Sequence, residues 1–361
     1  MGGLPVFEPL VVQSHRGSYT AFFEDDALAH LDARVPRNVH FLVDAKVAGL
    51  YAADLGHVLA SPSVLAVEAT EASKSLDRFP AYVEHLVSRG VRRGHILVAI
   101  GGGVIQDITC FLAATLLRGV EWHFYPTTLL AQADSCIGSK SSINVGSIKN
   151  ILGTFTPPAQ IRISTHLLAT LAKQDIRSGI GEMLKVHAIE GPDSFDRIAA
   201  DYHRIRSEPA TIAHYIRRSL AIKKDIIEQD EFDRDRRNIM NYGHSFGHAI
   251  ESATAFAVPH GIAVTIGMDM ANYVAFRLGR TERQHYDRMH PVLAMNYAGF
   301  EGMEIPVAAF FAALAKDKKN TDAKLTLILP DRSARVSRGT YFHDAAFRAI
   351  CAEYLATERG R

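Results

Sequence analysis

Short runs of β-branched and aromatic residues alternate with helical patterns over about the first 160 residues, and this alternation constrains the fold more than any other feature. Continuous apolar strands separated by helices are typical of a buried, mostly parallel sheet. The first part of the chain therefore predicts an α/β domain. The strand-like runs are residues 39–46, 64–70, 95–103 and 121–128, and the clearest helical patterns between them are residues 75–90 and 104–119.

The pattern changes after the paired prolines of "FTPP" (155–158), where long helical periodicities replace the strands. A chain of 361 residues exceeds the size at which one core usually stops growing, so we expect two domains. We predict a nucleotide-binding α/β domain over 1–158 and a mainly helical domain over 159–361. The helical patterns are residues 165–190, 193–206, 209–229, 243–256 and 260–278, with one late strand-like run at 324–330.

Composition narrows the class of protein. With 47% hydrophobic and 22% charged residues and a net charge of +1, the chain gives no reason to expect a nucleic acid or an anionic membrane as partner. No apolar run approaches the roughly 20 residues that a membrane span needs. Three scattered cysteines do not form a disulfide framework, and the start lacks the features of a secretion signal, so we expect a cytoplasmic protein.

Three glycines follow the strand in "ILVAIGGGVIQD" (96–107) and precede a helix. Glycines in this position let a ligand approach the backbone, and the free N–H groups of a helix start favour a phosphate. The stretch lacks the GxGxxG fingerprint, and a tight turn without a ligand explains the glycines equally well. Asp44 ends an earlier strand, where it can accept a ribose hydroxyl or cap the next helix.

Residues 134–150, "DSCIGSKSSINVGSIKN", are rich in turn-forming residues and carry Lys140, Lys149 and Asn150. Lysines among exposed backbone amides suit a phosphate oxyanion, although a solvated surface loop has the same composition. The charged run 228–237 is most simply a solvated face.

Histidines and one buried carboxylate suggest a metal site. In "GIGEMLKVHAIE" (179–190), Glu182 and Lys185 lie three apart on one helix face among apolar residues, so the helix is predicted to be buried. His244 and His248 are four apart, and His260 opens another apolar helix. A single histidine is more often structural, but three beside Glu182 favour a catalytic zinc site.

Nine blocks of the sequence resemble 3-dehydroquinate synthase and the related sugar phosphate cyclases over roughly residues 40 to 330. They include "GGGVIQD" (101–107), "PTTLLAQADS" (126–135), "GEMLK" (181–185), "NYGHSFGHAIE" (241–251) and "HGIAVTIGM" (260–268). The remaining blocks are "EASK" (71–74), "LRG" (117–119), "KN" (149–150) and "DKKN" (317–320). The resemblance implies a Rossmann-like NAD-binding N-terminal domain, a mainly helical metal-binding C-terminal domain, and a cleft between them.

The resemblance also implies roles for individual residues. Glu182, His244 and His260 would bind zinc, or cobalt, and His248 would carry a proton together with the catalytic residues Lys185 and Asp134. Arg118 would reach the active site of a neighbouring subunit, which implies a homodimer. The implied NAD-binding residues are Asp44, Glu71, Lys74, Gly102, Gly103, Asp107, Thr127, Thr128, Lys149 and Thr170. The implied substrate-binding residues are Lys140, Asn150, Lys223, Arg237, Asn241 and Lys318.

The implied reaction oxidises a secondary alcohol transiently, eliminates phosphate, returns the hydride and closes a ring by an intramolecular aldol step. Arg237 and Lys223 match positions that face a carboxylate in dehydroquinate synthases, which favours 3-deoxy-arabino-heptulosonate 7-phosphate as substrate. Several residues depart from the usual motifs, however, and they suggest an alternative substrate such as sedoheptulose 7-phosphate or an amino analogue. These departures are Lys46, Gln106, Ser139, Ala172, Asp233 and Ile262.

Two further alternatives remain open. Metal-dependent polyol dehydrogenases have similar glycine-rich loops and paired histidines, but their first metal ligand is usually Asp and they lack the phosphate-binding lysines. A degenerate homologue that binds NAD and zinc without catalysis would lack a ligand or a phosphate contact, and none is missing here. Residues 1–38 and 331–361 carry no interpretable signal.

Overall fold

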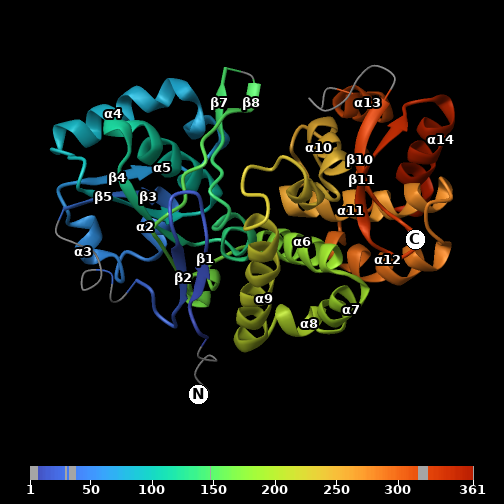
Figure 1. Cartoon of the computed structure of the whole chain (residues 1–361), viewed down its shortest axis with the longest axis horizontal. Coiled ribbons are helices and arrows are strands. Elements are labelled where there is room, and N and C mark those ends of the chain that lie inside the picture. The colour runs from blue at the N-terminus through green and yellow to red at the C-terminus, as the bar shows by residue number, and fades with distance from the viewer. Residues whose placement is uncertain (1–6, 29–30, 32–37, 147, 316–323, 361) are drawn as a thin grey trace. The chain divides into compact units, whose positions relative to one another are not determined.

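The computed structural model describes residues 7–28, 31, 38–146, 148–315 and 324–360 (Figure 1). Contacts divide the chain into two compact units: Met1–Leu171 with Ile212–Phe232, and Ala172–Thr211 with Asp233–Arg361. The division differs from the boundary at 158/159 that the sequence suggests. A further strand, β9 (Gln160–Ile163), joins the first unit after the paired prolines, and most of helix α9 (Pro209–Ile227) also belongs to it.

The first unit is built on a seven-stranded sheet in the order β1-β2-β9-β6-β5-β3-β4. Only β1 pairs antiparallel, with β2, and every other pairing is parallel. The central strand β5 is buried along its whole length, as its uniformly apolar sequence predicts. The strands are β1 (Leu10–Val12), β2 (Tyr19–Phe23), β3 (Val39–Asp44), β4 (Val64–Val67), β5 (Ile96–Gly101), β6 (Glu121–Pro126) and β9.

The strand order reverses between β3 and β5, because the chain goes from β3 to β4 on one side and then crosses to β5 on the other. Asp44 ends β3 and Gly101 ends β5, so both lie at the carboxyl edge of this reversal. In open α/β sheets this position is where ligands bind.

Helices and one hairpin complete the first unit (Figure 1). Its α-helices are α2 (Ala45–Leu50), α3 (Gly56–Leu59), α4 (Phe79–Ser88), α5 (Gly103–Thr115) and α9. The short helices are η1 (Glu71–Lys74), η2 (Leu76–Arg78), η3 (Leu116–Arg118), the π-helix η4 (Ala131–Ser135) and η5 (Thr165–Leu168). The hairpin consists of β7 (Ile143–Val145) and β8 (Ile148–Leu152).

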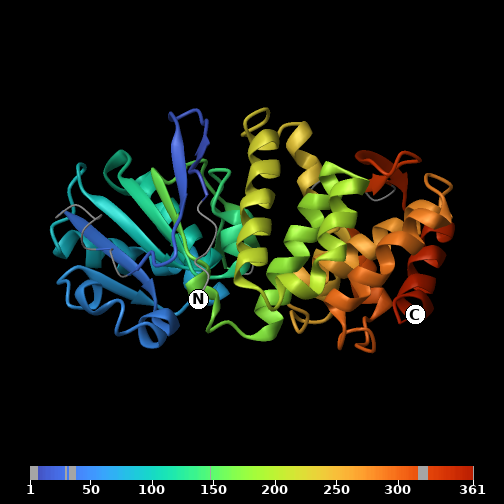
Figure 2. The ribbon, with the colours of Figure 1, turned by 90° about the horizontal axis from the view of Figure 1, so that it is seen from below.

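The second unit is mainly helical, as Figure 2 shows in light green to red. Its α-helices are α6 (Lys173–Glu190), α7 (Pro192–Ala200), α8 (Tyr202–Ile205), α10 (His244–Ala253), α11 (His260–Arg277), α12 (Arg283–Tyr297), α13 (Val307–Ala315) and α14 (Ala345–Glu353). It also contains the 3-10 helix η6 (Arg236–Asn241), the hairpin β10 (Lys324–Pro330) with β11 (Val336–Phe342), and the π-helix η7 (Tyr354–Glu358).

Glycines allow α11 to touch its two neighbouring helices. A Cβ atom on Gly261 would lie 1.9 Å from the carbonyl oxygen of Ser178 on α6, and one on Gly267 would lie 2.1 Å from the carbonyl oxygen of Gly243. Such distances are sterically impossible for any other residue, so these glycines are required by packing. Each of Gly181, Gly243 and Gly261 immediately precedes or follows one of the proposed metal ligands, and the close helix contacts therefore bring those side chains together.

Two expectations from composition agree with the structure. The three cysteines are buried free thiols. Within the part of the chain that the structure describes, no helix combines the length and the apolar character needed to cross a bilayer.

Candidate active site

The carboxyl edge of the sheet places several predicted NAD-binding residues side by side. A Cβ on Gly101 would lie 3.3 Å from the Cβ of Asp44, and one on Gly102 would lie 2.9 Å from Cγ2 of Thr128. The amide of Thr127 donates to the carbonyl of Gly101. The first two glycines are thus explained by packing, whereas a Cβ on Gly103, the first residue of α5, would meet open space.

Asp44 caps a helix, as one of the two sequence interpretations expected. Its Oδ1 accepts from the amide of Lys46 at 2.9 Å, at the start of α2. The second carboxylate oxygen can accept from another donor, so capping the helix and binding a ribose hydroxyl are compatible. Thr170 is exposed, and its hydroxyl lies 3.1 Å from that of Tyr51, the residue that ends the same helix α2.

A polar network joins η1, α5 and the β7–β8 hairpin. The buried Lys74 donates from Nζ to Oδ2 of Asp107 at 3.0 Å and to Oδ1 of Asn150 at 2.9 Å. Asn144 donates to the carbonyl and the carboxylate of Glu71 and accepts from the amide of Asn150. Burial raises the pKa of Asp107, although Lys74 acts in the opposite direction. Three predicted cofactor residues and one predicted substrate residue therefore form one cluster.

Asp134 and Lys223 form a second cluster in the first unit. Asp134 lies in the π-helix η4, and Nζ of Lys223 on α9 donates to its Oδ1 at 2.5 Å and to its carbonyl at 2.7 Å. Gln106 on α5 is hydrogen-bonded to the same π-helix. Its Nε2 donates to the carbonyl of Ser135, and its Oε1 accepts from the hydroxyl of Ser135, both at 2.6 Å. Single-turn π-helices often occur at functional sites.

The unusual serine before Lys140 has a specific partner. Ser139 has a φ of 66°, a conformation that favours glycine, and its hydroxyl donates to Oε1 of Glu231 at 2.5 Å. Glu231 also accepts from the hydroxyl of Ser14 and the amide of His15. Burial alone would raise the pKa of Glu231, but these hydrogen bonds outweigh it and lower the pKa. Glu231 is therefore bound to other parts of the first unit, and the run 228–237 is only partly a solvated face.

The second unit brings a carboxylate and three imidazoles together. Glu182 is 2% exposed, and its Oε1 lies 3.4 Å from Nε2 of His260 and 3.7 Å from Nε2 of His244. One ring nitrogen from each of His244, His248 and His260 lies within 4.8 Å of the other two. Nζ of Lys185, also buried, lies 2.5 Å from the other oxygen of Glu182.

This donor set fits a tetrahedral metal ion. Ligand atoms bound to zinc at about 2.0–2.1 Å lie roughly 3.3 Å from one another, close to the separations of Glu182 from the two histidines. His248 lies one helical turn beyond His244 and is exposed. The spacing of nitrogens alone also admits His248 as a ligand, but Glu182 makes its close contacts with His244 and His260.

The two histidines beside Glu182 differ in their electrostatic surroundings. Burial lowers the pKa of His244 well below its ordinary value, and the charge of Lys185 lowers it further. Burial also tends to lower the pKa of His260, but hydrogen bonds and charges of Glu182 and Glu251 outweigh it and raise the pKa to about 10. A cation bound here would displace a proton from His260. Its positive charge would then balance the negative charges of the two carboxylates.

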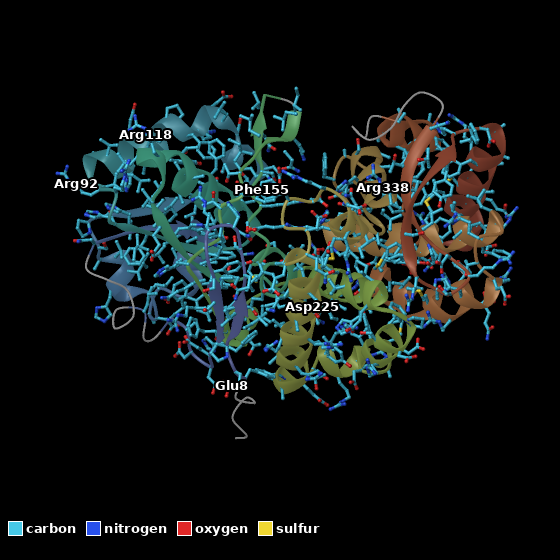
Figure 3. All side chains as sticks on the ribbon, in the orientation of Figure 1. Glu8, Arg92, Arg118, Phe155, Asp225 and Arg338 are labelled. Atoms are coloured by element: carbon cyan, nitrogen blue, oxygen red, sulfur yellow. The ribbon has the colours of Figure 1, made fainter. Side chains whose placement is uncertain are left out.

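The remaining predicted substrate residues are distributed over both units. Arg237 is buried in η6 of the second unit, and Asn241 ends the same short helix, where its side chain donates to the carbonyl of Asn238. Lys140 is exposed in the first unit, and so is Lys149 on β8, which was predicted to bind NAD. Arg118 lies on the surface of the first unit (Figure 3). Lys318 lies outside the described residues.

Sequence reasoning missed several polar residues that organise these clusters. Asn144 and Ser142 hold Asp107, Asn150 and Glu71, but a single Asn or Ser in a turn-rich loop gives no signal of its partners. Glu251, which contacts His260, had a usable signal. It follows His248 by three residues and His244 by seven, which places it on the same face of the helix.

Comparison with known proteins agrees with this geometry. Residues 64–178 match the profile of the 3-dehydroquinate synthase N-terminal domain, and residues 179–320 match that of the C-terminal domain. A 3-dehydroquinate synthase from Xanthomonas oryzae pv. oryzae (strain PXO99A) is 35% identical over 321 residues, covering 82% of this chain and 86% of that protein. One from Paracoccus denitrificans (strain Pd 1222) is 34% identical, covering 90% of each.

Solved structures with the same fold include two cyclases. A 2-deoxy-scyllo-inosose synthase complexed with carbaglucose-6-phosphate, NAD+ and Co2+ superposes with a TM-score of 0.85 at 21% identity, covering 96% of this chain and all of that one. The 2-epi-5-epi-valiolone synthase of Streptomyces hygroscopicus subsp. jinggangensis 5008, with NAD+ and Zn2+ bound, gives 0.83 at 25% identity, covering 94% and 97%. A probable glycerol dehydrogenase from Sinorhizobium meliloti 1021 gives only 0.58 at 12%, covering 94% and 97%. On the matched domains and the identity with its relatives, the chain belongs to the 3-dehydroquinate synthase family.

Proposed function

We propose that this protein is an NAD- and zinc- or cobalt-dependent sugar phosphate cyclase that converts 3-deoxy-arabino-heptulosonate 7-phosphate to 3-dehydroquinate. The observation that carries the proposal is the buried Glu182–Lys185 pair facing His244 and His260. The curated relatives named 3-dehydroquinate synthase, 34–35% identical over most of the chain, support this substrate.

The two bound groups have separate tasks: NAD supplies reversible hydride transfer, and the metal supplies a Lewis acid. In the first unit, the start of α5 at Gly103 and the carboxylate of Asp44 lie at the sheet reversal, where a dinucleotide binds in related folds. The residues that would hold NAD there are Asp44, Glu71, Lys74, Gly102, Gly103, Asp107, Thr127, Thr128, Lys149 and Thr170.

Residues of the second unit would hold the metal and move protons. Glu182, His244 and His260 provide one carboxylate and two imidazoles, the donor types that zinc prefers. Lys185 pairs with the oxygen of Glu182 that does not face the histidines. His248 projects from the helix that carries His244, and its exposed imidazole is suited to exchanging a proton with a substrate hydroxyl.

Cationic and amide side chains would bind the two acidic ends of the substrate. Arg237 offers a planar fork for the carboxylate, and the lysines and Asn150 suit a departing phosphate dianion. Lys223 is already paired with Asp134, so we assign this pair to positioning and proton transfer as well as to charge. The proposed substrate-binding residues are Lys140, Asn150, Lys223, Arg237, Asn241, Lys318 and, from a second subunit, Arg118.

Phosphate release from two substrates side by side tests the proposal. With NAD and Zn2+ present, 3-deoxy-arabino-heptulosonate 7-phosphate should release phosphate and yield a cyclic product by NMR, whereas sedoheptulose 7-phosphate should not react. Arg237→Met should raise KM for the first substrate strongly, because the buried fork that binds the carboxylate is lost. Turnover of sedoheptulose 7-phosphate alone would instead identify a cyclitol synthase, the alternative that the departures at Ser139 and Ile262 suggested.

We further propose that the enzyme is a cytoplasmic homodimer. Leu117 and Arg118 both have positive φ, 52° and 65°, and such strained backbone at non-glycine residues is concentrated at functional positions. The strain turns an exposed arginine outward from η3, which fits a side chain that acts on another subunit.

A further inference from the structure

Glu251 is a buried carboxylate next to the proposed metal centre that has no role among the metal ligands or the substrate-binding residues. It lies on α10 with His244 and His248, and the spacings of seven and three residues place all three on one helix face. Glu251 is only 9% exposed. A carboxylate buried to this extent needs a compensating partner.

That partner is His260. Both carboxylate oxygens of Glu251 lie 3.3 Å from Nδ1 of His260. The opposite ring nitrogen, Nε2, lies 3.4 Å from Oε1 of Glu182. His260 is thus fixed at both nitrogens between two carboxylates, although its side chain is 37% exposed and would otherwise be able to rotate.

His244 has the same arrangement with a different acceptor. Its Nδ1 lies 3.2 Å from the backbone carbonyl oxygen of Tyr242, and its Nε2 faces Glu182. In both histidines an acceptor at Nδ1 holds a ring proton there, so that Nε2, which faces Glu182, is the nitrogen left to bind a metal. Acceptors of this kind fix the tautomer of metal-binding histidines and make them stronger ligands.

We propose that Glu251 is a positioning residue, which holds His260 in the Nδ1–H tautomer and aims its Nε2 at the metal. The inference rests on the proposed metal centre and adds to it a residue that sets metal affinity without touching the metal. A carboxylate also makes the imidazole a stronger donor than the carbonyl does for His244.

Cobalt binding to the full-length protein tests this role without any need for turnover. Co2+ is titrated into the protein after chelator treatment, and its visible absorption reports both affinity and coordination geometry. Glu251→Leu removes the acceptor, whereas Glu251→Gln keeps an acceptor oxygen but removes the charge. We expect the Kd for Co2+ to rise about 10- to 100-fold for Glu251→Leu and by less for Glu251→Gln, with a changed absorption spectrum in the former.

Two further variants make the result interpretable. His260→Ala removes a ligand and should weaken binding at least as much as Glu251→Leu. Glu353→Gln removes a carboxylate charge in the same unit that bonds Tyr273 and Arg277, away from the histidines, and should bind Co2+ like the wild type. Unfolding in urea, measured for each variant, separates a change in folding from a change in the metal centre.

The outcomes are distinct. If both Glu251 variants bind Co2+ with unchanged affinity and spectrum while His260→Ala binds weakly, the metal centre stands and the positioning role is wrong. If the wild type itself binds no Co2+, the proposed metal centre and the role of Glu251 fall together.

Discussion

Glu182 and Lys185 are 2% and 3% exposed and form an ion pair in the interior of a helical unit. A buried pair contributes little net stability, but removing one partner leaves an uncompensated charge, which is costly. A cation that binds Glu182 as well would explain why this charged pair is buried. We infer that the buried charge at this point in α6 serves the proposed metal site at the expense of stability.

Lys185→Met tests this interpretation through stability. Without added metal, we expect the free energy of unfolding to fall by about 3–5 kcal/mol, because Glu182 loses its buried counter-ion. Saturating Zn2+ should recover much of this loss by replacing the missing positive charge. Urea unfolding with and without Zn2+ measures both values.

Lys224→Met provides the matched control. Lys224 pairs with Glu228 across one helical turn in a partly exposed position, so its loss should cost no more than about 0.5 kcal/mol. An equal loss for Lys185→Met with and without Zn2+ would show that no metal compensates Glu182.

His285 makes stability depend on pH. Burial, reinforced by the charge of Arg288, lowers its pKa to about 4. Between pH 6.5 and 4 the unfolded chain binds a proton at this residue that the folded chain does not, so the free energy of unfolding falls as the pH falls. The loss amounts to at most about 3 kcal/mol and levels off below pH 4.

His285→Gln should weaken that dependence. The substitution keeps a donor for Oδ1 of Asn272, which His285 Nε2 contacts at 3.2 Å, but removes the titrating group. The measurement is urea unfolding of both proteins from pH 7 to pH 4. If the two curves remain parallel over this interval, His285 does not contribute to acid instability.

At the scale of elements, the π-helix η4 is held by its two neighbours. Lys223 on α9 binds Asp134 within it, and Gln106 on α5 binds Ser135 at its end. Gln106 gives this chain a side-chain connection between α5 and η4, which a glycine, the residue that the resemblance leads one to expect at this position, could not make. We infer that it fixes the register in which Asp134 faces Lys223.

Gln106→Leu should disturb both stability and catalysis. Loss of the reciprocal hydrogen bonds leaves the polar atoms of Ser135 unsatisfied, which costs about 1–3 kcal/mol. We expect kcat to fall more than KM rises, because Asp134 is displaced from its reactive position. Gln174→Leu, at an exposed position of α6, is the control. If Gln106→Leu destabilises the protein but leaves kcat and KM unchanged, Gln106 has only a structural role.

The elements that could be predicted from the sequence are those in which apolar residues recur with a clear helical or strand periodicity. The central strands and the helices α9, α10 and α11 lie close to their expected ranges, whereas the helix expected from residue 165 begins only at Lys173, after the separate 3-10 helix η5. The i, i+3 pairing of Glu182 with Lys185 follows from helix geometry alone. The strands β1 and β2 at one end of the sheet, the hairpin partner β11 and helix α14 were missed. Short or exposed strands such as β11 carry little periodic signal, and their formation depends on a partner distant in sequence.

Site residues could be predicted only where a motif fixes them. The ligand set of Glu182, His244 and His260 came from family motifs, and the structure brings these residues together through the close contacts at Gly181, Gly243 and Gly261. The partners of Ser139 and Gln106 were not predictable, because each depends on which helices and loops become neighbours in the folded unit.

At the scale of the whole molecule, each unit contains part of the proposed machinery. The first unit carries the sheet reversal with its glycines, and the second carries the histidines and Glu182. The proposed reaction requires both parts, and the proposed dimer adds Arg118 from a second chain.

Subunit mixing tests the contribution of Arg118. Arg118→Ala and His260→Ala homodimers should each be nearly inactive, because every site lacks one residue. After the subunits are exchanged, half of the dimers are mixed and each mixed dimer has one complete site, so activity should return to about one quarter of the wild type. Activity that stays at the level of the two parents would place Arg118 in the site of its own chain or outside it.

The proposed enzyme closes a ring without net redox chemistry, and one reaction distinguishes this from dehydrogenation. Phosphate and NADH are measured together while 3-deoxy-arabino-heptulosonate 7-phosphate is converted with NAD and Zn2+ present. We expect one phosphate to be released for each substrate consumed, with no accumulation of NADH, because the hydride returns to the same molecule. NADH that accumulates in step with substrate loss, with no phosphate released, would instead identify a dehydrogenase.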